Sequence, residues 1–222
     1  NLEVTSNIKI KNSKYKKLDL FNKYLPKIQD LIIIKDHDIK AIYKDNELNV
    51  NGMGKIQVQN EFDQINYSIS KLGDKFNFDV KLFLNKSLLN IDYLNFSKNK
   101  NLKTQIVVVG NYKKNNSLNF NEISLISKDN KIKFINFSIN KNNKIKNLDK
   151  VELDYYDKEN KKNQFLLSKN NKNEYKLDGK IFNANKLITD LLDINKEKKF
   201  NFFKNDFKLL INLQNVLIDD QN

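Results

Sequence analysis

The sequence contains no cysteine, tryptophan or arginine, and it has one histidine, one proline and five glycines. The absence of cysteine excludes disulfide bonds, thiolate metal ligands and cysteine nucleophiles. Glycine-rich phosphate loops, serine-nucleophile elbows and paired-histidine zinc motifs are also missing. The only adjacent carboxylates near an end are residues 219–220, and their position favours no hydrolytic role. We therefore expect no catalytic residues, no cofactor and no metal site, and we predict that the protein is not an enzyme.

All 40 basic residues are lysine, and the formal net charge is +13 at pH 7. One interpretation is a codon bias toward Lys, Asn, Ile and Phe, with lysine spread over solvated faces. The other is attraction to an anionic partner, such as lipid head groups or nucleic acid. Sequence-specific recognition of nucleic acid relies on bidentate contacts from arginine, which this chain lacks. We therefore expect no nucleic-acid partner.

Long hydrophobic runs are absent as well. The longest uninterrupted apolar runs are residues 31–34 and 106–109. A transmembrane helix needs roughly 18 to 20 such residues. Because the sequence begins with Asn1, we expect residues 1–222 to be a single β-rich segment of a longer protein.

The dominant pattern in the sequence is alternation of apolar and polar residues. In residues 76–84 the apolar side chains of Phe76, Phe78, Val80 and Leu82 alternate with polar ones, and shorter runs of the same kind recur between residues 65 and 155. Successive side chains of a β-strand point to opposite faces. Each run therefore predicts a strand with one apolar side, as in an antiparallel sheet that is covered on one face only.

Clusters rich in Asn, Asp and Lys separate these runs, for example residues 44–47, 72–74, 128–131 and 157–162. Asn and Asp tolerate a left-handed backbone and serve as turn residues. Turns at intervals of about a dozen residues are typical of a strand-rich architecture.

Several runs change phase after residues 93, 120 and 134. A shift of one residue moves the apolar set to the other face unless a β-bulge absorbs it. We therefore predict repeated bulges that bend and twist the sheet. Residues 14–24 and 185–192 have helical spacing, with Asn183 or Asn185 as the cap of the second helix. The predicted fold class is mainly β: a long, twisted, curved antiparallel sheet with an open, taco-like groove and two short helices.

Two small motifs have simple structural explanations. His37 lies between Asp36 and Asp38, but a metal site needs several ligands on one side, and we expect a solvated turn there. Gly52 and Gly54 lack the third glycine and the helix of a phosphate loop, so they indicate a turn or a bulge.

The apolar face remains as the candidate functional surface. If another layer closes it, the protein is a β-sandwich or solenoid with a structural or adhesion role and no lipid role. If the groove stays open, the exposed apolar area favours an apolar guest, because covering it contributes about 25 cal/mol per Å². The residues predicted to face the groove are Phe76, Phe78, Val80, Leu82, Ile91, Tyr93, Phe120, Phe134, Phe137, Val151, Leu153 and Tyr155.

One stretch resembles a known family. Residues 175–192, Tyr175-Lys-Leu-Asp-Gly179-Lys-Ile-Phe-Asn183-Ala-Asn-Lys-Leu187-Ile-Thr-Asp-Leu191-Leu192, are similar to a recurring element of AsmA-like envelope proteins. In that element a strand ending in Gly is followed by Asp or Asn, a small residue and a short Leu-rich helix. The spacing of the alternating runs in residues 120–155 is also similar. The resemblance is greatest to the YhdP branch of the family, with TamB as a cousin. Asn183 departs from the family pattern, which usually has Asp there.

The resemblance implies a specific role. Such proteins are anchored in the inner membrane of Gram-negative cells and extend through the periplasm. Their long open β-sheet has a hydrophobic groove that carries phospholipids toward the outer membrane. For this chain the resemblance implies intermembrane phospholipid transport, phospholipid acyl chains as ligands, and a membrane anchor and further repeats outside residues 1–222. It implies no catalytic residues.

Overall fold

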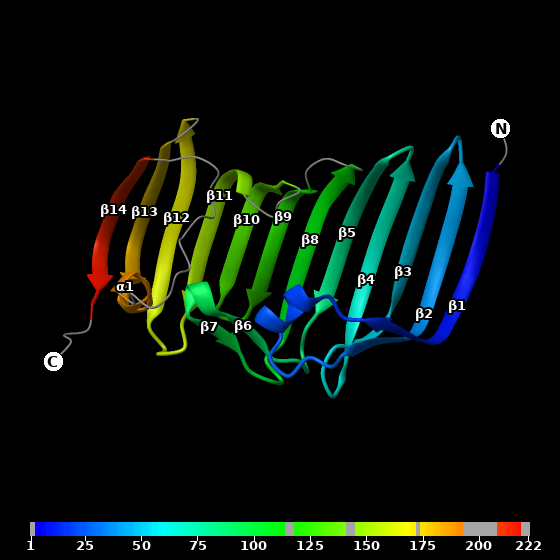
Figure 1. The fold of residues 1–222 in the computed structure, drawn as a ribbon, viewed down its shortest axis with the longest axis horizontal. Helices are drawn as coiled ribbons and strands as arrows, with labels where there is room; N and C mark the ends of the chain where they lie inside the picture. Colours follow the sequence, from blue (N-terminus) through cyan, green and yellow to red (C-terminus); the bar gives the residue numbers. More distant parts are fainter. Residues whose placement is uncertain (1–2, 114–117, 141–144, 172–173, 193–207, 219–222) are drawn as a thin grey trace.

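The computed structural model describes residues 3–113, 118–140, 145–171, 174–192 and 208–218. Twelve strands form one large sheet and lie side by side in chain order (Figure 1). These strands are β1 (Glu3–Lys16), β2 (Leu31–Lys44), β3 (Glu47–Gln57), β4 (Phe62–Leu72), β5 (Lys75–Phe83), β8 (Thr104–Lys113), β9 (Leu118–Ser127), β10 (Lys131–Ile139), β11 (Ile145–Tyr156), β12 (Lys162–Asn171), β13 (Glu174–Asn183) and β14 (Lys208–Leu217). Neighbouring strands are antiparallel, except that β13 and β14 are parallel.

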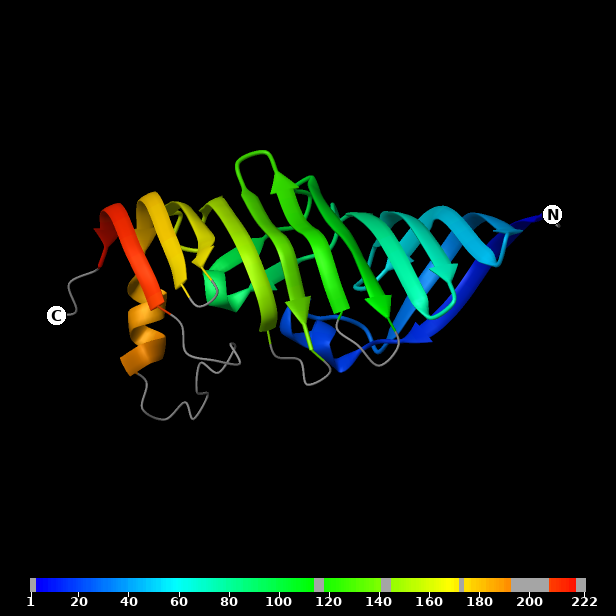
Figure 2. The same ribbon diagram turned by 90° about the horizontal axis from the view of Figure 1, so that it is seen from above.

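Five short elements lie outside the large sheet. The strands β6 (Leu89–Ile91) and β7 (Phe96–Lys98) pair with each other, and the 3-10 helix η2 (Asp92–Leu94) connects them. A second 3-10 helix, η1 (Asp19–Lys23), lies between β1 and β2, and the helix α1 (Asn185–Leu192) follows β13. All of them lie on one side of the curved sheet (Figures 1 and 2). We call residues 84–103, which contain β6, η2 and β7, the insertion.

The register gives the sheet one apolar face. Residues directly opposite each other on paired strands have their side chains on the same face. Tracing the pairings from strand to strand yields one row across all 12 strands: Ile8, Ile39, Gly52, Tyr67, Val80, Val108, Ile123, Phe134, Val151, Leu167, Leu177 and Ile211. We call this the central row. Its members are aliphatic, aromatic or glycine, so the face is apolar from one edge of the sheet to the other.

The opposite, outer face is largely polar, with some apolar side chains such as Met53, Val107 and Leu166, and it carries ion pairs between neighbouring strands. Glu152 of β11 lies 2.7 Å from the ammonium of Lys131 and 2.5 Å from that of Lys150. Lys133 of β10 lies 2.8 Å from Glu122 of β9. An antiparallel sheet with one solvated face has this division into an apolar and a polar side.

The structure confirms the predicted fold class: mainly β, with one large, curved, open antiparallel sheet and few helical residues. The alternative of a closed β-sandwich is wrong, because the strands of the large sheet form a single layer in the described part of the chain (Figure 2).

Bulges keep the apolar set on one face where the sequence changes phase. The register between β8 and β9 shifts between Val109 and Gly110, which pair with Glu122 and Phe120. Asn121 is the extra residue, so Phe120 and Ile123 both lie on the apolar face. In β10 the backbone of Asn136 is left-handed, with φ 51°. The phase change after residue 93 has another cause, because the chain there forms η2 and is not part of the large sheet.

The buried core lies between the large sheet and the insertion. Leu84, Leu89 and Phe96 of the insertion pack against buried residues of the sheet. Those sheet residues are Leu125, Ile132, Leu148, Val151, Leu153, Tyr155 and Tyr175. The insertion therefore covers one part of the apolar face.

One helix prediction is wrong and the other is confirmed. Residues 14–24 do not form a single helix, because β1 continues to Lys16 and pairs with β2, and only Asp19–Lys23 form a 3-10 helix. The second prediction matches α1. The side-chain oxygen of Asn183 accepts a hydrogen bond of 3.3 Å from the backbone N–H of Asn185, the first helical residue.

Candidate functional site

Most of the predicted groove residues lie on the apolar face of the large sheet. They follow alternate positions of β5, β9, β10 and β11: Phe76, Phe78, Val80, Leu82, Phe120, Phe134, Phe137, Val151, Leu153 and Tyr155. The other two, Ile91 and Tyr93, belong to β6 and η2 and lie outside the sheet. Ile91 packs against the core, and Tyr93 is exposed.

The insertion covers the predicted groove residues of β11. Val151, Leu153 and Tyr155 are each at most 5% exposed. The ring of Tyr155 meets that of Phe96 edge-to-face, with centroids 5.8 Å apart. Its hydroxyl donates a hydrogen bond of 2.8 Å to the carbonyl oxygen of Leu94, and burial raises the pKa of that hydroxyl well above its usual value. These side chains belong to the protein's own core.

Buried polar side chains hold the insertion on the sheet. The Asp63 carboxylate of β4 accepts hydrogen bonds from three consecutive backbone N–H groups, those of Asn85 (2.7 Å), Lys86 (2.7 Å) and Ser87 (3.1 Å). The amide of Gln59 accepts from the Leu88 N–H at 2.9 Å and donates to the Leu88 carbonyl oxygen at 3.1 Å. Charge-assisted hydrogen bonds of this kind are stronger than neutral ones, so Asp63 is the main anchor.

Lys98 is a second anchor of the insertion. It is almost completely buried, and its ammonium donates to the carbonyl oxygens of Ser87 (2.6 Å) and Asn99 (3.1 Å). Burial lowers the pKa of this ammonium, while the nearby charge of Asp63 acts in the opposite direction. Its hydrogen bonds therefore tie both ends of the insertion together.

Outside the insertion, the apolar face keeps exposed side chains. Ile8 of the central row is 45% exposed, and Ile69 and Tyr112 of the same face are 37% and 39% exposed. Most other central-row residues are half-buried, with Ile211 at the far edge more exposed. A continuous, partly exposed apolar surface of this kind usually marks a binding site.

Aromatic rings concentrate on this face across β5, β8, β9 and β10. Ring pairs lie 5.7–6.4 Å apart between centroids. We call the set Phe76, Phe78, Tyr112, Phe120, Phe134 and Phe137 the aromatic band. Gly110 leaves room for it, because a Cβ at that position would lie 2.8 Å from Cζ of Phe78. Such pairs contribute about 0.5–1.5 kcal/mol beyond their area burial.

The structure corrects the predictions for His37 and for the Gly-Met-Gly sequence. His37 lies within β2 and is only 2% exposed, so the predicted solvated turn is wrong. Gly52 and Gly54 lie in the interior of β3 and not in a turn, but Gly54 faces a bulge, because residues 36 and 37 of β2 both lie opposite it. A Cβ on Gly54 would lie 2.1 Å from the His37 ring, so this glycine makes room for the imidazole. Glycine inside a strand often marks such a close approach.

The carboxylates beside His37 do not join it. Asp36 has a left-handed backbone, with φ 54°, where the register of β2 against β3 shifts. Its carboxylate lies 3.0 Å from the Lys55 ammonium, and this hydrogen bond lowers the pKa of the Asp36 carboxyl. His37 is therefore a structural residue, and the extra residue in β2 is the reason that its ring reaches the apolar face.

Sequence reasoning missed much of the central row. It omitted Ile8, Ile39, Tyr67, Val108 and Leu167 from the candidate residues, although Tyr67 lies in an alternating run. The missing signal was the register, since only the pairing of neighbouring strands shows which residues share a row.

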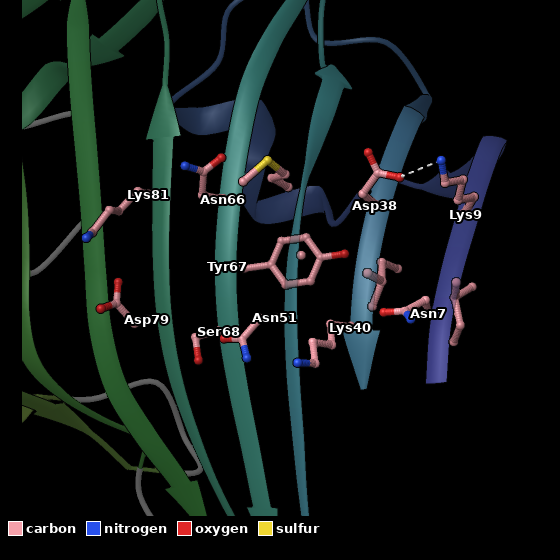
Figure 3. A pocket seen from close by; sticks show the side chains of 14 residues that line it. Asn7, Lys9, Asp38, Lys40, Asn51, Asn66, Tyr67, Ser68, Asp79 and Lys81 are labelled. Atoms are coloured by element: carbon pink, nitrogen blue, oxygen red, sulfur yellow. Dashed lines mark ion pairs between the residues drawn. The ribbon is translucent and has the colours of Figure 1, made fainter. Parts of the chain in front are cut away.

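A shallow hollow of about 600 Å³ spans β1 to β5 (Figure 3). By the register, most of its lining side chains, such as those of Asn66 and Ser68, lie on the outer face, and central-row residues such as Tyr67 lie between them along the strands. Lys9 and Asp38 form an ion pair of 3.7 Å at its margin, and both side chains are largely exposed. The hollow provides no enclosed polar site for a small ligand.

Comparisons with protein-family models, with curated proteins and with solved structures find no match. No helix in the described part of the chain is long and apolar enough to cross a membrane. No group of three or more His, Asp or Glu side chains among the described residues is placed to hold a metal ion. Asp219 and Asp220 lie outside the described residues. The candidate site is therefore the apolar face itself.

Proposed function

We propose that this chain binds phospholipid acyl chains along the apolar face of its curved sheet and serves as one segment of a bridge that carries phospholipid between two membranes. The observation that carries the proposal is the central row, in which apolar residues lie in register across all 12 strands. Polar side chains of the outer face leave that second face in water, so only one face suits an apolar ligand.

The dimensions of the row suit acyl chains. Neighbouring strands lie about 4.8 Å apart, so 12 strands extend over about 50 Å. The hydrocarbon core of a bilayer is about 30 Å thick and holds two acyl chains end to end. The row is therefore long enough for more than one phospholipid, and covering about 200 Å² of it contributes about 5 kcal/mol.

The insertion divides the proposed path into two sections. Near β11 the apolar face is closed by the chain itself, whereas around β1 to β5 it carries exposed side chains, and in the aromatic band Tyr112 is exposed while the other rings are half-buried. We place the acyl chains on the second section. A lipid that passes the insertion has to use the side of the face that Phe120 and Phe137 line.

The resemblance of residues 175–192 to AsmA-like envelope proteins supports the same role. The strand β13, then Asn183, Ala184 and α1, have the order of elements that the family pattern describes. In this proposal the protein lies in the periplasm of a Gram-negative cell, is tethered to the inner membrane by an anchor outside residues 1–222, and supplies phospholipid for the outer membrane.

Lipid analysis of the purified chain tests the proposal. Organic extracts of the protein are analysed by mass spectrometry, and a fluorescent phospholipid is titrated into a delipidated sample. We expect co-purified phospholipid and saturable binding. A protein that emerges free of lipid and does not bind the fluorescent phospholipid contradicts the proposal.

A further inference from the structure

The two edge strands of the large sheet differ in charge. β1 and β14 stand at the two ends of the strand order, so in the described part of the chain each of them pairs along one side only (Figure 1). β14 carries one charged residue, Lys208, and has neither proline nor glycine. β1 carries five charged residues: Glu3, Lys9, Lys11, Lys14 and Lys16. Because lysine on an edge strand discourages pairing with other strands, β1 is a protected edge and β14 is an unprotected one.

β14 also exposes apolar side chains on both faces of the sheet. Ile211 belongs to the central row on the apolar face, and its neighbour Leu210 lies on the outer face. Both side chains are exposed, as are those of Leu209 and Val216. An added strand forms hydrogen bonds with the free backbone edge and packs its side chains against those of the edge strand. The surface that β14 offers therefore matches a further apolar β-strand.

The sequence of β14 indicates which strand fits. Residues 209–217 read LLINLQNVL, and the order of apolar and amide residues is nearly the same in both directions from Leu213. In an antiparallel pair of two such strands with Leu213 opposite Leu213, most residues meet a residue of their own kind. These pairs are Leu209–Leu217, Leu210–Val216, Asn212–Gln214 and Leu213–Leu213, and the one unlike pair is Ile211–Asn215. Since opposite side chains share a face and interact directly, β14 is complementary to a second copy of itself.

We infer that two copies of this chain form a dimer through antiparallel pairing of their β14 strands, with Leu213 at the twofold axis. An interface between identical surfaces related by a twofold axis has to be self-complementary, and residues 209–217 meet that condition. The two Lys208 side chains lie at opposite ends of the paired strands, about 33 Å apart, so they do not repel each other. The lysines of β1 oppose the same arrangement at the other edge of the sheet.

The dimer joins the apolar faces of its two copies. A twofold axis perpendicular to the sheet keeps the apolar face of each copy on the same side, so the central row continues from Ile211 of one copy into the other. One strand from each copy buries less surface than the roughly 1,200 Å² of a standard interface. We therefore expect a weak dimer that depends on concentration. The inference does not rest on lipid binding, which is measured separately.

Sedimentation velocity of the full chain, from micromolar to submillimolar concentrations, tests the inference. The double variant Leu210→Lys, Val216→Lys places ammonium groups directly opposite each other in the inferred pair. Both positions are exposed in the single chain, so the variant should keep its melting temperature. We expect its dimer dissociation constant to rise about tenfold or more, because like charges that face each other oppose association. The matched control is Val4→Lys, Ile8→Lys, which adds the same charge at exposed apolar positions of β1 and should leave the dimer unchanged.

Disulfide cross-linking tests the register without adding charge. The chain contains no cysteine, so a single introduced thiol reports its own position. Leu213→Cys should form a covalent dimer under mild oxidation, because the two thiols meet at the twofold axis, within reach of a disulfide. Asn212→Cys should cross-link far more slowly, since its partner is Gln214, and Ile8→Cys on β1 should stay monomeric.

Three outcomes would overturn the inference. The first is a chain that stays monomeric at every concentration, as it would if β14 accepted a strand of another protein instead. The second is an equal weakening of the dimer by the β1 control variant. The third is cross-linking of Ile8→Cys as fast as that of Leu213→Cys. None of these results would contradict the binding of phospholipid to the apolar face, which the single chain retains.

Discussion

The ring of Tyr67 on β4 lies directly over Gly52 on β3. A Cβ on Gly52 would lie 2.3 Å from Cζ of Tyr67, so only glycine leaves room for this ring. The Tyr67 hydroxyl lies 3.3 Å from Nδ1 of His37, and Nε2 of His37 lies 3.0 Å from the carbonyl oxygen of Lys55. The tautomer protonated on Nε2 satisfies both contacts. Gly52 and Gly54 of β3 thus make room on the apolar face for the rings of Tyr67 and His37, which are hydrogen-bonded to each other.

Replacing Gly54 by Ala should destabilise the protein by about 1–3 kcal/mol, the usual range for overpacking. The new Cβ would lie 2.5 Å from Cγ of His37, an atom close to the backbone, so the buried imidazole has no room to swing aside. Urea denaturation measures the effect. Gly52→Ala should cost less, because it meets only the far end of the Tyr67 side chain. Equal stability of wild type and Gly54→Ala would contradict this account of β3.

Replacing Phe78 by Asp should impair phospholipid binding and transfer by about tenfold or more, since a charge on the apolar face is costly to bring against acyl chains. Asp79→Lys is the matched control, because its side chain lies on the outer face. The two variants are compared by the transfer of fluorescent phospholipid between vesicles. The proposal is in error if both lose transfer to the same degree, or if Phe78→Asp transfers normally.

Replacing Asp63 by Ala should release the insertion from the sheet. Three backbone N–H groups lose their acceptor, and buried unsatisfied donors cost about 1–3 kcal/mol each unless water reaches them. Hydrogen exchange in residues 85–88 should accelerate, and Leu153 and Tyr155 should become accessible. Asp74→Ala, an exposed change in the turn between β4 and β5, should leave the exchange unchanged. Unaltered exchange in Asp63→Ala would show that the apolar contacts alone hold the insertion.

The ion pairs of the outer face predict a pH dependence. Hydrogen bonds from Lys131 and Lys150 lower the pKa of Glu152 to about 2. Because the pKa falls on folding, the stabilisation is fully present above the unfolded-state value of about 4.5 and is lost as the pH decreases toward 2. Glu152→Gln should therefore cost about 1 kcal/mol or less at pH 7, after allowance for solvent screening. The difference from wild type should vanish near pH 2 in denaturation experiments, and a constant difference over this range would argue against it.

Asn183 has a structural reason to be an amide. Its side-chain N–H groups donate to the carboxylates of Asp157 (2.6 Å) and Glu159 (3.1 Å). An Asp at 183, as in the AsmA-like pattern, would place a third carboxylate beside these two. Asn183→Asp should thus destabilise the protein by about 1–3 kcal/mol at pH 7. The loss should shrink when the pH falls below 4 and carboxylates become protonated, and thermal denaturation at the two pH values measures it.

Much of the fold follows from local patterns in the sequence. Period-2 alternation marked β5, and the phase change between Phe120 and Ile123 indicated a bulge that the register confirms. Such signals are local, because each side chain's face depends on its neighbours along the strand. The predicted helix at residues 14–24 failed because pairing with β2 outweighs helical spacing in so short a segment.

The candidate site was less accessible to sequence reasoning. Leu89, Ile91 and Tyr93 alternate with polar residues as in a strand of the large sheet, yet they belong to β6 and the 3-10 helix η2 of the insertion. Their position depends on hydrogen bonds that the Asp63 carboxylate accepts from backbone N–H groups more than 20 residues further along the chain, and no local sequence pattern indicates such contacts.

The chain-order arrangement of strands has a consequence for size. Each antiparallel hairpin advances the sheet by two strand spacings, or about 10 Å, without altering its cross-section. The length of such a sheet therefore grows with the number of hairpins, whereas its width is set by the length of the strands. Duplication or loss of one hairpin would change the distance spanned in fixed steps while every remaining residue kept its side of the sheet.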